Sequence, residues 1–161
     1  MAGGLSPFVG QQIALLLKQK FDGCCIRLYD SSQQDGSALY PSDPSKAAIG
    51  TLLATVTVSG GNSGITWQTP TTEVLYKNPA EAWEEDSIVA SGRVRYLRIS
   101  PLTDDGTERN DIPRADFIAG TYAEYVAGNT SITARFENTT LVLGQPFRVN
   151  AASMTVVLSF G

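Results

Sequence analysis

Cys24 and Cys25 are adjacent, and they are the two cysteines of a chain of 161 residues that contains no histidine. A structural zinc site needs four ligands, normally two cysteine pairs or cysteines with histidines. A redox dithiol normally shows Cys-x-x-Cys at the start of a helix. A disulfide between neighbours is strained, because their Cα atoms lie ~3.8 Å apart whereas disulfides usually span ~4.4–6.8 Å. The two cysteines are therefore predicted to have a structural role and not a chemical one. We expect a strand with Cys24 reduced in the core and Cys25 on the opposite face, where a thiol reagent reaches it first.

Carboxylates are the remaining groups suited to catalysis, since the lack of histidine excludes Ser-His-Asp, Cys-His and His-based zinc sites. They gather in two places, which are Asp104, Asp105, Glu108 and Asp111, and the run Glu81, Glu84, Glu85 and Asp86. Oxygen ligands at the first place could hold calcium, but the spacing fits no EF-hand and Asp-Gly is common in plain turns. The second run is more typical of a solvated face than of a glycosidase acid pair. We therefore expect no catalytic residue, no cofactor and no metal.

Arginines and aromatic residues suit binding more than catalysis. Arg93, Arg95 and Arg98 lie on one predicted strand and are candidates for ion pairs with these acids, within the fold or across a subunit contact. The net charge of −4 argues against nucleic acid as a main partner, because phosphates require a clustered excess of Lys and Arg. Trp67 and Trp83, with six tyrosines, could stack on sugars, although tryptophans of a β-sandwich lie more often in its core.

The first element that positions these residues is a helix over residues 6–22. Ser6 is a suitable N-cap, Pro7 suits the first turn, and Gly23 stands where helices often end. Apolar residues recur along it at helical spacing, namely Val9, Ile13, Leu16, Leu17 and Phe21. This stripe either packs on its own domain or docks on a neighbouring subunit. The candidate interaction residues are accordingly Phe8, Val9, Ile13, Leu16, Leu17, Arg93, Arg95 and Arg98.

After Gly23 the apolar period changes from that of a helix to that of a strand. One face of residues 24–30 holds Cys24, Ile26 and Leu28, and the other holds Cys25, Arg27 and Tyr29. Residues 51–58 alternate similarly, with one face made of Leu52, Ala54, Val56 and Val58. Further strands are predicted at residues 64–69, 72–78 and 92–100, and in the last third around Ile132, Ala134 and Phe136, then Leu141 and Leu143, then Met154, Val156, Leu158 and Phe160. Residues 80–86 are expected to form a helical turn with Trp83 pointing inward.

This pattern predicts a single domain over residues 1–161, a mainly β fold with one N-terminal α-helix. Its short alternating strands favour an antiparallel β-sandwich of jelly-roll or Ig-like type. Two polar loops, residues 31–46 and 101–116, are expected at the ends of the sandwich, where binding surfaces are usually built. The N-terminal sequence lacks the features of a signal peptide, and no stretch approaches the ~20 apolar residues of a membrane span. We therefore expect a soluble protein with no membrane partner.

The order of several short motifs along the chain resembles the order found in a known protein family. The predicted helix is followed by Ile26-Arg27-Leu28-Tyr29-Asp30, Gly50-Thr51-Leu52-Leu53, Ser91-Gly92, Tyr96-Leu97-Arg98-Ile99, Asp104-Asp105-Gly106-Thr107, Pro113-Arg114 and Asn138-Thr139-Thr140-Leu141-Val142-Leu143-Gly144. This order resembles that of small structural proteins of tailed-bacteriophage virions, which are encoded among the capsid and tail assembly genes. Residues 115–135 depart from the family's pattern and leave the local arrangement open.

The resemblance implies a non-enzymatic structural component of the virion, present in many copies and made in the host cytoplasm. Its implied partners are other virion proteins and copies of itself. A capsid decoration or minor capsid protein is the first expectation, and a tail, neck or baseplate component is the second. A carbohydrate-binding β-sandwich module that recognises host surface glycans is the alternative from another class, since the aromatic residues suit it.

Overall fold

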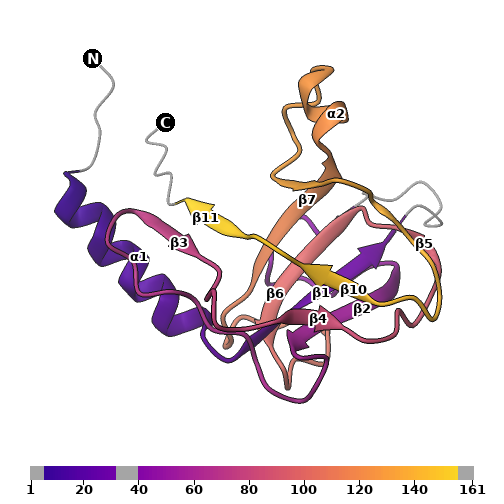
Figure 1. Cartoon of the computed structure of the whole chain (residues 1–161), viewed down its shortest axis with the longest axis horizontal. Coiled ribbons are helices and arrows are strands. Elements are labelled where there is room, and N and C mark those ends of the chain that lie inside the picture. The colour runs from indigo at the N-terminus through magenta and orange to yellow at the C-terminus, as the bar shows by residue number, and fades with distance from the viewer. Residues whose placement is uncertain (1–5, 32–39, 156–161) are drawn as a thin grey trace.

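The computed structural model of the chain describes residues 6–31 and 40–155 (Figure 1). Its first element is helix α1 (Pro7–Phe21). The Ser6 hydroxyl caps this helix by accepting a hydrogen bond from the N–H of Val9 at 3.4 Å. Gly23 follows the helix with φ of 81°, a left-handed conformation that glycine adopts without steric cost. The predicted helix over residues 6–22 is confirmed, including its cap and its end.

A seven-stranded sheet forms the body of the molecule. Its strands are, in spatial order, β10 (Phe147–Val149), β4 (Trp83–Glu85), β2 (Thr51–Val58), β1 (Cys24–Asp30), β6 (Tyr96–Pro101), β7 (Ala115–Thr121) and β8 (Ala134–Phe136). Two separate ribbons pair β3 (Val74–Tyr76) with β11 (Ser153–Thr155) and β5 (Gly92–Arg93) with β9 (Thr140–Leu141). The mainly β fold with an N-terminal helix is confirmed. The pairing is antiparallel except at one place, where β7 and β8 pair in parallel.

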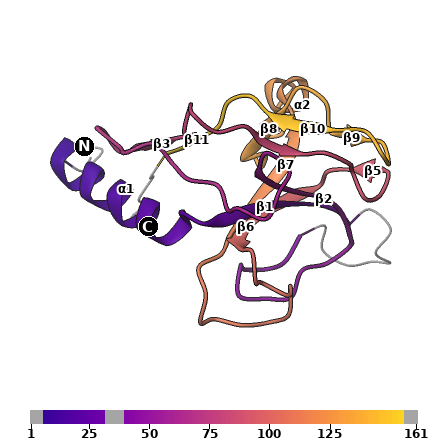
Figure 2. The ribbon, with the colours of Figure 1, turned by 60° about the horizontal axis from the view of Figure 1, so that its bottom comes forward.

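The sheet curls until its two edge strands approach each other. The ring of Phe136 on β8 lies 6.3 Å from the ring of Phe147 on β10, although these strands stand at opposite ends of the spatial order. Figure 2 shows β8 and β10 close together above the central strands. Strand twist that accumulates across the sheet produces curvature of this kind. The inside of the curl is where the apolar core lies.

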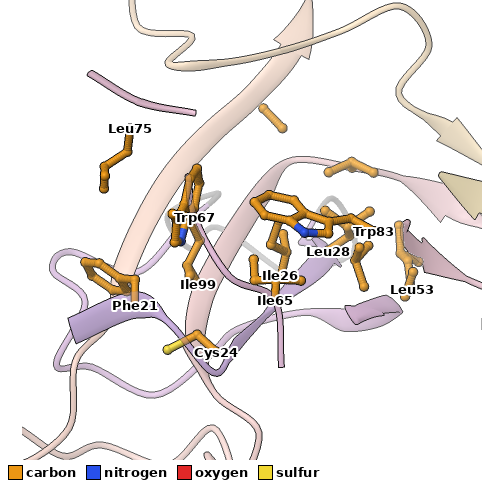
Figure 3. Packing of buried hydrophobic residues seen from close by; sticks show 14 of the residues in the cluster. Phe21, Cys24, Ile26, Leu28, Leu53, Ile65, Trp67, Leu75, Trp83 and Ile99 are labelled. Carbon is orange, nitrogen blue, oxygen red and sulfur yellow. The ribbon is translucent and has the colours of Figure 1, made fainter. Parts of the chain in front are cut away.

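The core lies between the curled sheet and the end of α1 (Figure 3). Trp67 and Trp83 pack edge to face in it, with ring centroids 5.0 Å apart and ring planes at 82°. Phe21, the last residue of α1, belongs to the same cluster. β1 adds the three residues that its alternation predicted for the core face, which are Cys24, Ile26 and Leu28. The helix and the sheet therefore share one core.

Residues 80–86 form no helical turn, and the prediction of one is wrong. They contain strand β4, in which Glu84 lies between Thr57 of β2 and Arg148 of β10. Trp83 does point inward and is fully buried, as predicted. Hydrogen bonding to a strand on each side, together with burial of this indole, outweighs the weak helical preference of the neighbouring acids.

The opposite face of β1 and β6 is covered by the two polar loops. Tyr29 and Tyr96 stack on this face with ring centroids 4.9 Å apart. The Tyr96 hydroxyl donates to the carbonyl of Ile49 and accepts from its N–H, both at 2.9 Å. The loops also bond to each other, since the N–H of Arg109 donates to the carbonyl of Ser45 at 2.8 Å. They were expected at the ends of a sandwich, but their described parts lie across the sheet (Figure 2). Residues 32–39 of the first loop lie outside the described residues.

A β-bulge decides which residues of β2 face the core. Leu28 pairs with Ala54 and Tyr29 pairs with Leu52, so Leu53 is the extra residue on β2. Leu53 is fully buried in the core, whereas Leu52 is half-buried. The prediction that placed Leu52 on the core face is wrong at this residue, because strict alternation assumes a strand without a bulge.

Residues 115–135 contain two elements that the sequence did not indicate, strand β7 and helix α2 (Tyr122–Val126). The helix begins with a capping box. The Thr121 hydroxyl accepts from the N–H of Glu124 at 3.1 Å, and the Glu124 carboxylate accepts from the N–H of Thr121 at 2.7 Å. Strand β10 was likewise not predicted. Three residues of the last predicted strand lie outside the described residues, namely Val156, Leu158 and Phe160.

Candidate functional site

Helix α1 presents small residues to the rest of the fold. Its buried residues are Gly10, Ala14 and Phe21. The chain before β3 passes so close to Gly10 that an added Cβ would stand 2.8 Å from the Cβ of Glu73. Half-buried Leu17 packs on the core from the same side. Of the five residues of the predicted apolar stripe, only Leu17 and Phe21 therefore face the core. The other three lie on the outer side of the helix.

The remaining apolar residues of α1 form an exposed surface, named here the helix patch and defined by Phe8, Val9, Ile13 and Leu16. Phe8 is 68% exposed and Leu16 is 53% exposed, while Ile13 is half-buried. Figures 1 and 2 show α1 at one end of the molecule, beside the β3–β11 ribbon. The patch is thus apolar surface that the described fold does not cover.

Arg98 is not on the surface. Its guanidinium is fully buried and donates two hydrogen bonds of 2.7 Å to the carboxylate of Asp116 and one of 3.0 Å to the carbonyl of Lys46. These bonds tie β6 to β7 and to the first polar loop. The structure thereby corrects the assignment of Arg98 as an interaction residue. Arg98 is buried because the polar loops cover the face of β6 on which it lies. The sequence did not indicate that position of the loops.

Arg93 and Arg95 line a common hollow of about 270 Å³, named here the arginine cavity. The other lining residues come from the first polar loop, β7, α2 and the chain after α2, and they are Tyr40, Ile118, Ala119, Glu124, Asn129, Ser131 and Ile132. Arg93 forms an ion pair with Glu124. Hydrogen bonds from Thr121 and from Arg93 hold the pKa of Glu124 below its ordinary value. The charge of Arg93 is therefore already matched within the fold.

Arg95 stands between β5 and β6, and its backbone is fixed on both sides. Its N–H donates to the carbonyl of Tyr29 at 2.8 Å, and its carbonyl accepts from the N–H of Ala119 at 2.9 Å. Among the described residues no acceptor bonds to its side chain, and the buried Nε has no hydrogen-bond partner. Within residues 6–31 and 40–155, Arg95 thus lines the cavity without a carboxylate partner.

Three of the four acids in residues 104–111 form ion pairs with different cations, and the fourth, Asp105, bonds to Thr107. The ion pairs are Asp104 with Arg114, Glu108 with Lys46, and Asp111 with Arg109. In residues 6–31 and 40–155, no group of three or more His, Cys, Asp or Glu side chains is placed to hold a metal ion. In the described residues, the acids that suggested a calcium site therefore stabilise the second polar loop through these contacts.

The acids of residues 81–86 also serve the fold. The Glu81 carboxylate accepts from the N–H of Thr66 at 2.9 Å and from the indole N–H of Trp83 at 2.8 Å. Glu84 pairs with Arg148 across β4 and β10 at 2.7 Å. These carboxylates point to different elements, which is not the arrangement of an acid pair around a scissile bond.

Both cysteines are free thiols and both are buried. Cys24 lies in the core, as predicted. Cys25 lies on the opposite face, but it is 0% exposed because the loops cover that face. Burial raises the pKa of Cys24 to about 12, and burial also raises the pKa of Cys25. The expected faster reaction of Cys25 loses its physical basis, since both thiols are shielded and protonated.

The two tryptophans offer no stacking surface for a sugar. Trp67 is 3% exposed and Trp83 is 0% exposed, and each packs against the other in the core. The exposed tyrosines Tyr40, Tyr76 and Tyr122 lie on different elements, namely the first polar loop, β3 and α2. The aromatic platform inferred from the composition is therefore not formed by these tryptophans.

Several residues of the arginine cavity escaped the sequence prediction. Ile118, Glu124 and Asn129 all lie in residues 117–131, where no element was predicted. The spacing of Thr121 and Glu124 was the available signal, because it matches a capping box and hence a helix start. That helix start would have placed Glu124 near a strand end, but nothing in the sequence paired it with Arg93.

Comparisons of the chain with protein-family models, with curated proteins and with solved structures found no match in any of the three. No helix in the described part of the chain has the length and apolar character needed to cross a membrane.

Proposed function

We propose that the chain is a non-enzymatic structural component of a tailed-phage virion, most simply a capsid decoration or minor capsid protein. The observation that carries the proposal is the helix patch. A protein held in a particle by repeated contacts needs surface that a neighbour can bury, and exposed apolar patches commonly mark such contacts. The resemblance of the motifs between Ile26 and Gly144 supplies the virion context. The proposed location is the virion, after synthesis in the host cytoplasm.

The proposed occupant of the helix patch is a second copy of this chain. Helix α1 contains Lys18 and Lys20 and no acidic residue, whereas the whole chain carries a net charge of −4. A neighbouring copy therefore offers acidic surface around an apolar contact. Burying a Leu or Phe side chain fully contributes about 1.5–3 kcal/mol, so covering the exposed parts of Phe8 and Leu16 contributes about 3 kcal/mol per patch.

Two finer points belong to the same proposal. A tail, neck or baseplate component would use the helix patch equally well, with other virion proteins as further partners. The curled sheet and its ribbons are also proposed to represent a sandwich of jelly-roll or Ig-like type. The approach of Phe136 and Phe147 across the sheet edges is the contact that supports it.

A carbohydrate-binding module is the proposal from another class, and it now depends on the exposed tyrosines alone. A glycan array probed with the assembled protein tests it. Binding above background that is lost in Tyr122→Ala would favour this role over a purely structural one. A blank array would leave the structural role as the stronger proposal.

Quantitative mass spectrometry of purified particles tests the virion role directly. We expect peptides of this chain at a copy number comparable with that of other structural proteins. Absence from the particle, or trace amounts only, would overturn the proposal. Labelling the protein and imaging the particle then separates a capsid position from a tail, neck or baseplate position.

Self-association through the helix patch needs point variants, because deletion of residues 1–22 would also remove buried Ala14 and Phe21. Leu16→Glu places a charge in the patch, and Leu143→Glu makes the same change at an exposed leucine that follows β9, outside α1. We expect sedimentation to show that Leu16→Glu dissociates assemblies that the wild type and Leu143→Glu retain. Equal assembly of both variants would refute the assignment of the patch.

A further inference from the structure

A second hollow lies next to the arginine cavity, beside β7. This second hollow measures about 240 Å³ and shares Tyr40 and Ile118 with the cavity. Its remaining lining residues are Pro41, Ser42, Asp43, Pro44, Tyr96, Asp116, Phe117 and Thr133. Residues of β7, the strand that leads up to α2 in Figure 1, line both hollows. No residue of α1 is among the lining residues of either hollow. We name the two together the β7 groove.

The two ends of the β7 groove differ in chemistry. The arginine cavity contains Arg95, which has no carboxylate partner among the described residues, and exposed Asn129 and Ser131 at its rim can donate further hydrogen bonds. The second hollow is largely apolar, with rings and aliphatic groups from Tyr40, Pro41, Pro44, Phe117 and Ile118.

Two aspartates line the apolar hollow, but each has hydrogen bonds from the fold. The Asp116 carboxylate accepts both of its 2.7 Å bonds from Arg98. The Asp43 carboxylate accepts from the N–H of Ser45 at 2.9 Å. The arginine cavity is therefore the cationic end of the groove, because Arg95 has no carboxylate partner among the described residues. The second hollow is its apolar end.

From this arrangement we infer that the β7 groove binds an extended acidic peptide of a partner protein, with a carboxylate side chain at Arg95 and the next apolar side chain against Tyr40 and Phe117. A guanidinium binds a carboxylate through two parallel hydrogen bonds, which are strong because both groups are charged. Burying the apolar side chain of the peptide against Tyr40 and Phe117 removes it from water, which also favours binding. This site shares no residue with the helix patch, so its failure would leave the proposed function untouched.

The charges of the groove favour a carboxylate over a phosphate. Of the two arginines in the cavity, Arg93 is already paired with Glu124, so one guanidinium charge is left for a ligand. A monoanionic carboxylate matches that single charge. A phosphate dianion would bring a second negative charge, which the single guanidinium of Arg95 does not match. Two adjoining hollows also suit two successive side chains better than one compact ion.

The test is an NMR titration of the full chain with the blocked dipeptide acetyl-Glu-Leu-amide. We expect saturable shifts at the amides of Ala119 and Gly120 and at the Arg95 side chain. Three changes should each weaken binding about tenfold or more. They are Arg95→Gln in the protein, Gln in place of Glu in the peptide, and Gly in place of Leu in the peptide. Arg148→Gln, which removes an exposed arginine on β10, should leave the affinity unchanged.

Other outcomes would overturn the inference. Inorganic phosphate that binds as tightly as the dipeptide would identify a small-anion site and not a peptide groove. Equal affinity of the Glu and Gln peptides for the wild type would remove the role of the carboxylate, and this comparison needs no protein variant. Should Arg95→Gln fail to fold, Ser131→Tyr at the exposed rim serves as the blocking variant. Unchanged binding by Ser131→Tyr would also contradict the inference.

Discussion

The ion pair of Asp104 and Arg114 is the place where a single substitution should expose how the second polar loop is held. Both side chains are almost completely buried, at 1% and 2% exposure. The Arg114 guanidinium bonds both carboxylate oxygens of Asp104 and donates to the carbonyl of Thr107 at 2.8 Å. Removing one partner of a buried pair leaves the other charged and unpaired, which costs about 3–5 kcal/mol. An asparagine retains some hydrogen bonding, so we expect Asp104→Asn to lower the free energy of unfolding by about 3 kcal/mol.

The pH dependence of this loss follows from the pKa of Asp104. Burial raises that pKa, but hydrogen bonds from Arg114 and from the N–H of Gly106 outweigh burial and bring it to about 2, from an ordinary value of 3.8. A lowered folded-state pKa gives stability that is present above the ordinary pKa and lost as the pH falls through the folded-state pKa. The difference in unfolding free energy between wild type and Asp104→Asn should therefore shrink by ~2 kcal/mol between about pH 5 and pH 2.

Urea unfolding of three proteins over this pH range is the assay. Asp105→Asn is the matched control, because Asp105 is the adjacent aspartate and its exposed carboxylate bonds only to the N–H and hydroxyl of Thr107, at 3.0 and 2.8 Å. We expect a much smaller loss for the control. Hydrogen bonds from Thr107 also lower the pKa of Asp105, so this loss should shrink in the same direction as the pH falls, but by less than that of Asp104→Asn. The reasoning is refuted if Asp104→Asn costs no more than Asp105→Asn, or if its cost stays constant down to pH 2.

Three further predictions concern the helix, the thiols and a turn. Phe21→Ala should lower the free energy of unfolding by about 3–5 kcal/mol, measured in urea, while Leu16→Ala should cost far less because its side chain is exposed; equal losses would contradict the two-sided helix. Cys24 and Cys25 should resist a thiol reagent in the native protein and react at once in urea; rapid native labelling would show that the loops do not cover β1. Gly50→Ala should cost more than about 1 kcal/mol by thermal melting, since φ there is 83° and an added Cβ would overlap the backbone of β1; an unchanged melting temperature would exclude that packing.

Local patterns predicted the elements whose partners lie close in sequence or whose signals are strong. Ser6, Pro7 and Gly23 bound α1 as predicted, because capping and glycine geometry depend on a few neighbouring residues. The alternation of Cys24 and Cys25 assigned the two faces of β1 correctly. It could not show that both faces are buried, since covering the second face requires loops from distant segments.

The errors arise where tertiary contacts override local preference. Glu84 belongs to a strand because β2 and β10 flank it, and β10 lies more than sixty residues further along the chain. The apolar stripe of α1 was assigned by hydrophobicity, but the helix packs through Gly10 and Ala14, since small residues allow close approach. Arg98 was grouped with Arg93 by spacing, whereas its burial depends on Asp116, a residue of a strand that the sequence did not indicate.

The closure of the sheet at Phe136 and Phe147 has a consequence for synthesis on the ribosome. The five strands from β4 to β7 lie within residues 24–121, but both flanking strands, β8 and β10, come from residues 134–149. Until that segment leaves the exit tunnel, the nascent sheet has open backbone edges at β4 and at β7, and open edges readily pair with other chains. Completion of the sheet must therefore follow translation of residues 134–149, and chains stalled before residue 134 should be the aggregation-prone ones.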